Sequence, residues 1–456
     1  PRWRWLVERV LRWLACKSHC QSIAGAVVYM VAAGCCSLTV MVMPTAGDAN
    51  DSLAEEGADA IPRESLMRLF LRFLHFGALA WGGPVAQLAM IRQQLVEEER
   101  WISSARFNRV LAVYQVLPGP EAHELCVYFG MRSRGRWGGI LAGLGFMLPG
   151  FLLMFALSWA YVRFGLKTDA SQSVFAAVQV AVAALIVRAV VRIGGHVVTD
   201  RWLWFFAILA TVAQLAGVHF SIILVVAGTL YLLARRGFRV MALAVTVLAV
   251  VGVVWLIERH GLVGLAALTA SPVAGEPSNA ATMSLPELFW SGLKAGLLTF
   301  GGAYTVIPFL QRDAVSGGAW MSNAQFLDGL ALSGLLPAPL IIFSTFVGYL
   351  GGGPWGAVAM TVGIFLPAFA FSLLGHDALE RWVHRPRIRI FLEGVTAGVV
   401  GLISGTTTGL LRISLINAEA LMLFAIVLAI LFASKAKLTI PALIAGAALW
   451  GWGTSS

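Results

Sequence analysis

Charged residues are scarce in this sequence, since Asp, Glu, Lys and Arg make up only 12% of its 456 residues. By contrast, 59% of the residues are hydrophobic and the mean hydropathy is +0.81. A soluble core cannot bury that much apolar surface, so this composition excludes a soluble globular domain and indicates a polytopic membrane protein. The 5 Cys show neither zinc-site nor disulfide spacing, so we expect no metal and no cofactor.

The motifs of several function classes are also missing. We find no His-Glu-x-x-His pattern, no serine nucleophile elbow and no spaced carboxylate pair suited to a metal, which argues against a membrane-embedded enzyme. No P-loop is present, so this chain alone is not an ATP-driven pump. The net charge of +10 comes from Lys and Arg in short clusters between apolar runs, without an aromatic-interleaved basic face, so we expect no nucleic-acid partner.

What the sequence does have is a repeat built on glycine and proline. The block Trp81-Gly82-Gly83-Pro84 recurs 219 residues later as Phe300-Gly301-Gly302-Ala303, and Leu117-Pro118-Gly119-Pro120 recurs as Leu336-Pro337-Ala338-Pro339. A repeat of roughly a hundred residues duplicates a group of helices, not one small unit. Its best-matched residues are those that break helices inside apolar sequence.

We therefore predict an all-α polytopic membrane protein with about thirteen transmembrane segments, in two homologous halves of inverted topology with broken helices. The expected divisions are an N-terminal extension (1–60), a first half (64–260), a linker (261–284) and a second half (285–456). The extension is read either as a signal or extra membrane helix, or as accessory or non-native sequence. The segment 66–96 is either a broken span or a re-entrant hairpin.

Loop charge supports the inversion. The loop with Arg132, Arg134 and Arg136 is predicted to be cytoplasmic, whereas its counterpart at 351–354 carries no charge. The basic loop of the second repeat comes one helix later. Seven predicted crossings separate the two equivalent loops, and an odd number inverts the second copy.

Inverted repeats with interrupted helices are typical of secondary transporters, whose substrate site forms where half-helix ends meet at mid-membrane. A helix N-terminus carries a partial positive charge, so such a site favours an anion. The alternative for any single Gly or Pro is a packing contact or kink, and recurrence in both halves favours the functional reading. The candidate break residues are Gly82, Gly83, Pro84, Pro118, Gly119, Pro120, Gly301, Gly302, Pro337 and Pro339.

Cations at membrane depth also point to an anionic substrate. His75 maps onto Lys294 at the 219 offset, so a cationic or protonatable group recurs at one position, and we expect this pair to attract the substrate. Further cations in or near the membrane are Arg72, Arg92, Arg188 and Arg192. The alternative to a functional role is that the side chain snorkels to the membrane interface. We favour snorkelling for Arg192, and for Arg72 and Arg92 we weigh the two readings equally.

Acidic residues and a histidine follow the first proline block only. Glu121, His123 and Glu124 are candidate proton carriers, because a carboxylate or imidazole in an apolar run can exchange a coupling proton. The equal alternative is that the two Glu merely cap a half-helix N-terminus.

On these residues the sequence resembles the chromate ion transporter (CHR) family. The motifs are the Phe76-Gly77 to Pro84 stretch, Gln115-Val116-Leu117-Pro118-Gly119-Pro120-Glu121, and Gly143-Leu144-Gly145-Phe146-Met147-Leu148-Pro149, with weaker copies in the second half. The resemblance covers residues 64–452. The second copy departs from the first at two positions, since Ala303 stands where the first copy has Pro84 and Ala338 stands where it has Gly119.

The resemblance implies a multi-pass protein of the bacterial inner membrane that exports chromate from the cytoplasm with the proton motive force and so gives chromate resistance. The expected partners are a small oxyanion (chromate, with sulfate as a close analogue), protons and the lipid bilayer. The alternative from the residues themselves is a transporter of sulfate or another anion. A membrane-embedded enzyme is the less favoured reading.

Overall fold

The structure is a computed structural model, and it describes residues 61–81, 83–115, 117–164, 169–197, 200–260, 283–300, 303–317, 320–383, 385–434 and 439–454. These residues all belong to one unit, Ala58–Ser456. The expected extension at 1–60 lies outside the described residues, as do 261–282 of the expected linker. Gly82, Gly301 and Gly302 of the two glycine blocks also lie outside them.

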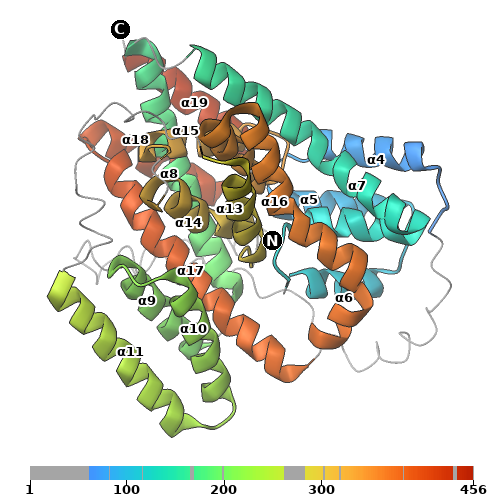
Figure 1. Cartoon of the computed structure of the whole chain (residues 1–456). Coiled ribbons are helices and arrows are strands. Elements are labelled where there is room, and N and C mark those ends of the chain that lie inside the picture. The colour runs from blue at the N-terminus through green and yellow to red at the C-terminus, as the bar shows by residue number, and fades with distance from the viewer. Residues whose placement is uncertain are drawn as a thin grey trace, which may run out of the picture. The chain divides into compact units, whose positions relative to one another are not determined.

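Within the described ranges every regular element is a helix, as the composition predicts (Figure 1). The first half contains α4 (Leu66–Ala78), α5 (Pro84–Ile91), η2 (Arg92–Glu98), α6 (Ser104–Tyr114), α7 (Glu121–Phe164), α8 (Asp169–Val197), α9 (Arg201–Leu215), α10 (Phe220–Arg235) and α11 (Arg239–His260). The second half contains α13 (Leu285–Leu297), η3 (Ala303–Val306), α14 (Ile307–Gln311), η4 (Arg312–Gly317), α15 (Asn323–Gly334), η5 (Leu340–Ile342), α16 (Phe343–Val383), α17 (Pro386–Ser414), α18 (Ala418–Ala433) and α19 (Thr439–Thr454).

The repeat extends well beyond the hundred residues that the sequence motifs mark. Helix α13 begins and ends 219 residues after α4, and α15 begins 219 residues after α6. The starts of α17, α18 and α19 then follow those of α8, α9 and α10 at offsets of 217 to 219. The helix caps recur as well, because Ser103 and Ser322 each accept a hydrogen bond from the backbone three residues on.

Helices α7 and α16 are each a tight helical hairpin. The chain turns at Gly135, with φ +62°, and at Gly353, with φ +63°, a backbone region that only glycine enters readily. Glycines let the two arms of each hairpin touch, since a Cβ on Gly130 would lie 2.4 Å from the Gly138 carbonyl oxygen. The turns coincide with the loops expected at 132–136 and 351–354.

The two halves exchange helices with one another. Helix α8 of the first half packs against α18 and α19 of the second, while α17 of the second half packs against α9 and α10 of the first (Figure 1). The hairpins α7 and α16 pack against each other. Each half therefore completes the other, and the interior surfaces near the breaks come from both.

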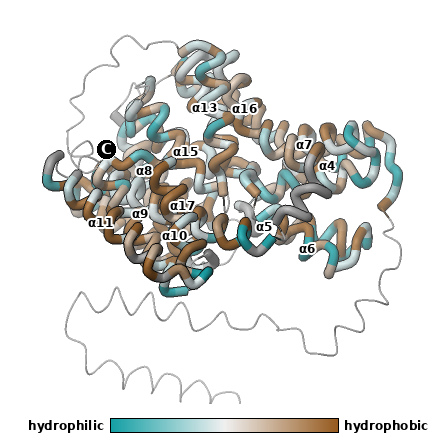
Figure 2. The backbone as a smooth tube through the Cα atoms, turned by 60° about the horizontal axis from the view of Figure 1, so that its bottom comes forward, coloured by the Kyte–Doolittle hydropathy of each residue, from teal (hydrophilic) through white to brown (hydrophobic). Residues whose placement is uncertain are grey.

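Four helical stretches of the described chain are long and apolar enough to cross a bilayer: Glu121–Phe164, Gln172–Gly195, Leu340–Leu374 and Arg387–Ser414. Apolar residues also cover the shorter helices α9 and α10 beside α17 (Figure 2). The count of about thirteen crossings and the inversion of the halves stay predictions.

Helix α4 has 13 residues and so is about 20 Å long, at ~1.5 Å per residue, against a bilayer core of ~30 Å. Its counterpart α13 has the same length. Neither helix crosses the membrane alone, as expected for interrupted segments.

Candidate functional site

A cavity of about 50 Å³ lies where the breaks of the two halves meet. Sites for drug-sized ligands are several times larger, at ~300–1,000 Å³, so this cavity suits a small solute. Its walls come from the first glycine block, the residues after the second glycine block, the second proline block, and helices α8, α15 and α19. The lining residues are Trp81, Gly83, Tyr304, Ile307, Leu336, Ala338, Leu340, Val182, Leu185, Ile186, Leu330, Ser333, Gly334, Ile440 and Pro441.

The breaks meet crosswise between the halves. Gly83 of the first half and Ala338 of the second half both line the cavity. The reciprocal contact joins the first proline block to the end of the second broken helix, because the Gly119 N–H donates to the Thr299 carbonyl at 2.9 Å. The sequence predicted that these motifs work together, and residues of two of the four blocks line the cavity, together with Tyr304 directly after the second glycine block.

Two helix N-termini open at the cavity. Helix α5 begins directly after Gly83, and the short η5 that leads into α16 begins directly after Pro339, next to the lining residues Ala338 and Leu340. Pro84 and Pro339 suit these starts, since proline at the first turn removes no helical hydrogen bond. The partial positive charge of helix N-termini makes this end of the cavity favourable for an anion.

The Tyr304 hydroxyl points toward the first glycine block. A Cβ built on Gly83 would lie 4.0 Å from this oxygen, and Gly83 itself has φ +79°. A side chain at this position would strain the backbone and narrow the space in front of the hydroxyl. Tyr304 thus offers a hydrogen-bond donor between the two halves.

Arg188 supplies positive charge beside the cavity. On α8, Arg188 follows the lining residue Leu185 by three residues, and Arg192 follows one turn later. Both arginines lie within electrostatic reach of Tyr304. Arg188 is half-buried and has one long contact, 3.5 Å, to the Ser434 carbonyl, whereas Arg192 is exposed. The sequence noted both residues as intramembrane cations but gave no reason to choose Arg188.

His75 and Lys294 lie away from the cavity lining. Lys294 Nζ contacts Asp313 Oδ2 at 2.8 Å, and Ser291 Oγ donates to the same oxygen at 2.7 Å. Asp313 lies on η4, which is separated from the second glycine block by η3 and α14. The sequence therefore did not reveal that Lys294 and Asp313 pair. His75 is exposed on α4.

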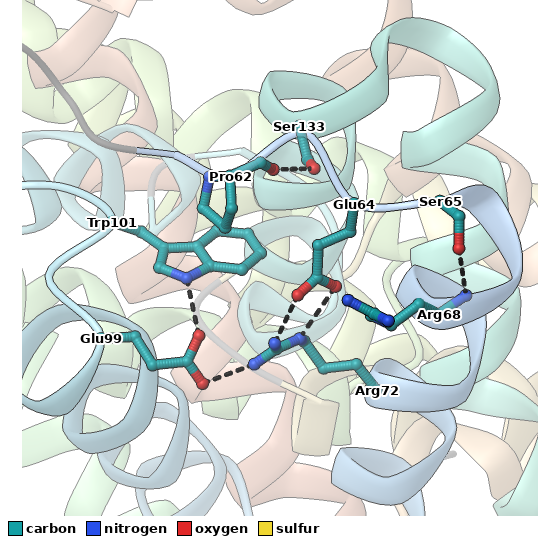
Figure 3. Close-up of polar contacts among 8 residues, drawn as sticks. All are labelled: Pro62, Glu64, Ser65, Arg68, Arg72, Glu99, Trp101 and Ser133. Atoms are coloured by element: carbon teal, nitrogen blue, oxygen red, sulfur yellow. Dashed lines mark hydrogen bonds and ion pairs between the residues drawn. The ribbon is translucent and has the colours of Figure 1, made fainter.

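Arg72 is also paired, in a polar cluster shown in Figure 3. Its guanidinium donates to both carboxylate oxygens of Glu64 and to Glu99, while the Trp101 indole N–H donates to the other Glu99 oxygen at 2.8 Å. Glu64 precedes α4 and Glu99 follows η2, so Arg72 holds together both flanks of the segment that the sequence left as a broken span or a hairpin. This arrangement fits a re-entrant hairpin.

Arg92 pairs with Glu97 at 3.1 Å, and both side chains are exposed. The Glu97-Glu98-Glu99 run is therefore partly solvated and partly bound through Glu99.

The three titratable residues after the first proline block lie in the interface between α7 and α16. His123 and Glu124 are fully buried, and the His123 ring lies 5.0 Å and 4.7 Å from the rings of Phe365 and Phe369. Neither carboxyl oxygen of Glu124 has a hydrogen-bond partner among the described residues, and a Cβ built on Gly119 would lie 2.7 Å from one of them. Glu124 thus faces the break and does not cap the helix, whereas Glu121 is half-buried at its first residue.

Asp328 is a buried acidic residue that sequence reasoning missed. It lies on α15, is fully buried, and accepts hydrogen bonds from Tyr161 and Gln179. A lone Asp in an apolar segment was the available signal. In the described part of the chain, no cluster of three or more His, Cys, Asp or Glu residues is arranged to hold a metal ion.

Comparison with known proteins gives a consistent result. The family model described as "Chromate transporter" matches residues 67–272 and 286–452, two regions that overlap the two predicted halves. A chromate transport protein of Pseudomonas aeruginosa is 56% identical over 397 residues, covering 86% of this chain and 93% of that protein.

More distant relatives carry similar names. A chromate transport protein of Cupriavidus metallidurans is 32% identical over 88% of this chain and 96% of its own length. A probable chromate transport protein of Synechococcus elongatus is 30% identical over 86% of this chain and 96% of its own length. No solved structure matches the chain.

Proposed function

Because the chain belongs to the chromate transporter family, a family of multi-pass membrane transporters and not of enzymes, we propose that it exports chromate from the cytoplasm. In this proposal it is a secondary transporter of the bacterial inner membrane, the proton motive force drives export, and the cell gains chromate resistance. The observation that carries the proposal is the small cavity at which broken helices of both halves meet beside Arg188.

The cavity has the features that a small oxyanion needs. Two helix N-termini and the Tyr304 hydroxyl at the lining, with the Arg188 guanidinium within electrostatic reach of Tyr304, offer positive potential and hydrogen-bond donors. The Arg188 guanidinium suits an oxyanion because its planar donors can contact two oxygens at once. In this proposal Arg188 takes the substrate-binding part first assigned to His75 and Lys294, since the Lys294 charge is already paired with Asp313.

The break residues give the cavity its shape and its ability to open to either side. Gly83, Pro84, Gly119, Pro337 and Pro339, together with their matched neighbours, end or start half-helices at the centre of the protein. We propose that the halves have opposite topology, with about thirteen crossings in all, and that rocking of one half against the other exposes the cavity alternately. The reciprocal exchange of α8 and α17 supports this arrangement.

Proton coupling is assigned to the buried group next to the first proline block. Glu124, with Glu121 and His123 beside it, lies in a water-poor interface between the two hairpins, and the Glu124 carboxyl has no cation or donor in contact. A carboxyl in such a place is readily neutralised by a proton. Its position against Gly119 links the protonation of Glu124 to the geometry of the break.

The test is flux of radiolabelled chromate in everted inner-membrane vesicles with an acidic lumen. We expect uptake into the vesicles that a protonophore abolishes and that sulfate reduces. Uptake that survives the protonophore would refute proton coupling. If folded, inserted protein takes up sulfate but not chromate, the alternative of a transporter for sulfate or another anion replaces the proposal.

The proton-carrying role of Glu124 is tested by Glu124→Gln, with Glu97→Gln on the exposed η2 turn as the matched control. We expect Glu124→Gln to exchange chromate down its own gradient but to stop responding to the pH gradient, whereas Glu97→Gln behaves like the wild type. Full dependence on the pH gradient in Glu124→Gln would assign Glu124 a structural role instead.

A further inference from the structure

A second buried carboxyl lies in the second half, on a helix that lines the cavity. Asp328, on α15, is fully buried. Its Oδ2 accepts a hydrogen bond from the Tyr161 hydroxyl at 2.7 Å, and its Oδ1 accepts one from the Gln179 side-chain amide at 2.7 Å. Tyr161 is on α7 and Gln179 on α8, so this contact joins one helix of the second half to two helices of the first.

Neutral groups are the only partners of this carboxyl in the described part of the chain. No described Lys, Arg or His lies within ion-pair distance of Asp328, and the groups that act on it electrostatically are Gln179 and Tyr161. Arg163 is exposed on α7, two residues beyond Tyr161 and hence on another face. Arg188 is nine residues beyond Gln179, about 13 Å along α8 at ~1.5 Å per residue.

Two of the other elements that pack against α15, α16 and α19, offer apolar groups at their contacts. Phe343 and Phe346 of α16 lie against Gly329, and Ile444 of α19 lies against Gly334. A buried carboxylate without a counter-ion is unfavourable, while two neutral donors stabilise it in part. Such a group changes protonation state with its surroundings, as a coupling site must.

The contact also joins two walls of the substrate cavity. Helix α15 contributes Leu330 and Ser333 to the lining, and α8 contributes Val182, which lies one turn beyond Gln179. A change at the Asp328 contact therefore acts on helices that line the cavity. Asp328 is distinct from Glu124, which lies in the α7–α16 interface.

We propose that Asp328 binds and releases a proton during transport, with Tyr161 as its positioning residue. This proposal rests on the proposed proton-coupled transport and names a second site for it. The proton adds to Oδ2, because a hydroxyl can turn from donor to acceptor, whereas the amide N–H of Gln179 can only donate. On release, the proton returns to water on the side to which the cavity is open, and Tyr161 donates to the carboxylate again.

The experiment compares Asp328→Asn and Tyr161→Phe with Asp200→Asn in proteoliposomes. Asp200 is a matched control, because it also accepts a hydrogen bond from a tyrosine, Tyr231, at 2.8 Å, but lies at the N-terminus of α9, where Asn caps equally well. Protons and chromate are counted together, with a pH-sensitive dye inside the liposomes and radiolabelled chromate.

We expect Asp328→Asn to move fewer protons per chromate than the wild type and Asp200→Asn to keep the wild-type ratio. An unchanged ratio in Asp328→Asn overturns the proposal. Failure of the proposed function is a different result, namely that the wild type itself moves no protons with chromate.

Tyr161→Phe leaves the Asp328 carboxyl in place, so this variant tests the proposal if Asp328→Asn does not fold. It removes a donor to the ionised form, so the pH midpoint of chromate exchange should rise by about one unit. An unchanged pH profile in a folded Tyr161→Phe protein would overturn the proposal. We expect the protonated Asp328 carboxyl to give an infrared band. This band should be lost in Asp328→Asn and shifted in Tyr161→Phe.

Discussion

In the first half, α7 begins with Glu121, His123 and Glu124, whereas the matching turn of the second half presents Leu340, Ile342 and Phe343. The same asymmetry holds elsewhere. Arg188 on α8 corresponds to Gly405 on α17, and Asp328 on α15 corresponds to Arg109 on α6, which is exposed. Helix lengths, caps, turns and breaks are repeated, while the buried ionisable groups occur once. The repeated features build the scaffold, and the unrepeated ones differentiate the two sides of the cavity.

Topology offers the largest contrast between the halves. Single cysteines introduced at Arg134 and Gly352, in the turns of the two hairpins, should react with a membrane-impermeant maleimide from opposite sides of the membrane. In intact cells we expect one position to be labelled and the other to be labelled only after permeabilisation. Labelling of both from the same side would contradict the inverted repeat.

The next largest difference between the halves is expected for positive charge near the cavity, which α8 carries in Arg188. Arg188→Gln removes a charge-assisted contact worth ~1.5–3 kcal/mol, so we expect the KM for chromate to rise about 10- to 100-fold. Thr406→Val, next to Gly405 at the matching position of α17, should leave the KM unchanged within about twofold. Vesicle uptake at several chromate concentrations measures both, and equal effects of the two substitutions would remove Arg188 from the site.

Substitution of the matched hairpin glycines should affect the stability of the protein similarly in both halves. A Cβ on Gly130 or on Gly348 would lie 2.4 Å from the carbonyl oxygen of Gly138 or Gly356, respectively. Gly130→Ala and Gly348→Ala should therefore each destabilise the protein by about 1–3 kcal/mol, through overpacking. Melting of detergent-purified protein, followed by size-exclusion chromatography, tests this. A large loss in one half and none in the other would show that the hairpins are not equivalent.

The smallest effect is expected at the Lys294–Asp313 pair. Its side chains are 39% and 24% exposed, so solvent screens the interaction, and we expect a coupling of about 0.5–1 kcal/mol in a double-mutant cycle with Lys294→Gln and Asp313→Asn. Chromate transport should change less than about twofold in either variant. Loss of transport in Lys294→Gln alone would restore Lys294 as a substrate-binding residue.

Local sequence was a good guide to where helices begin, break and turn. The glycine and proline blocks and the uncharged 351–354 turn all act through the backbone of a few neighbouring residues. Such signals are readable without the fold, because they depend on φ angles and missing N–H groups.

Side-chain partners were not readable in the same way. Lys294 looked free because Asp313 lies beyond the break, and Arg72 looked like an isolated membrane cation although Glu64 and Glu99 both bind it. Asp328 gave a weak signal, and its partners Tyr161 and Gln179 are more than a hundred residues away. Whether a charge is paired depends on which helices pack together.

The sequence by itself determined the membrane class, the two-half repeat and the family resemblance, because composition, periodic breaks and motif order are properties of the chain alone. Only the tertiary structure decided that α8 and α17 cross into the opposite half. With them it decided that Arg188 lies near Tyr304 of the cavity and that Gln179 contacts Asp328. The physical reason is that burial and electrostatic contact are set by packing between distant segments, which local patterns do not encode.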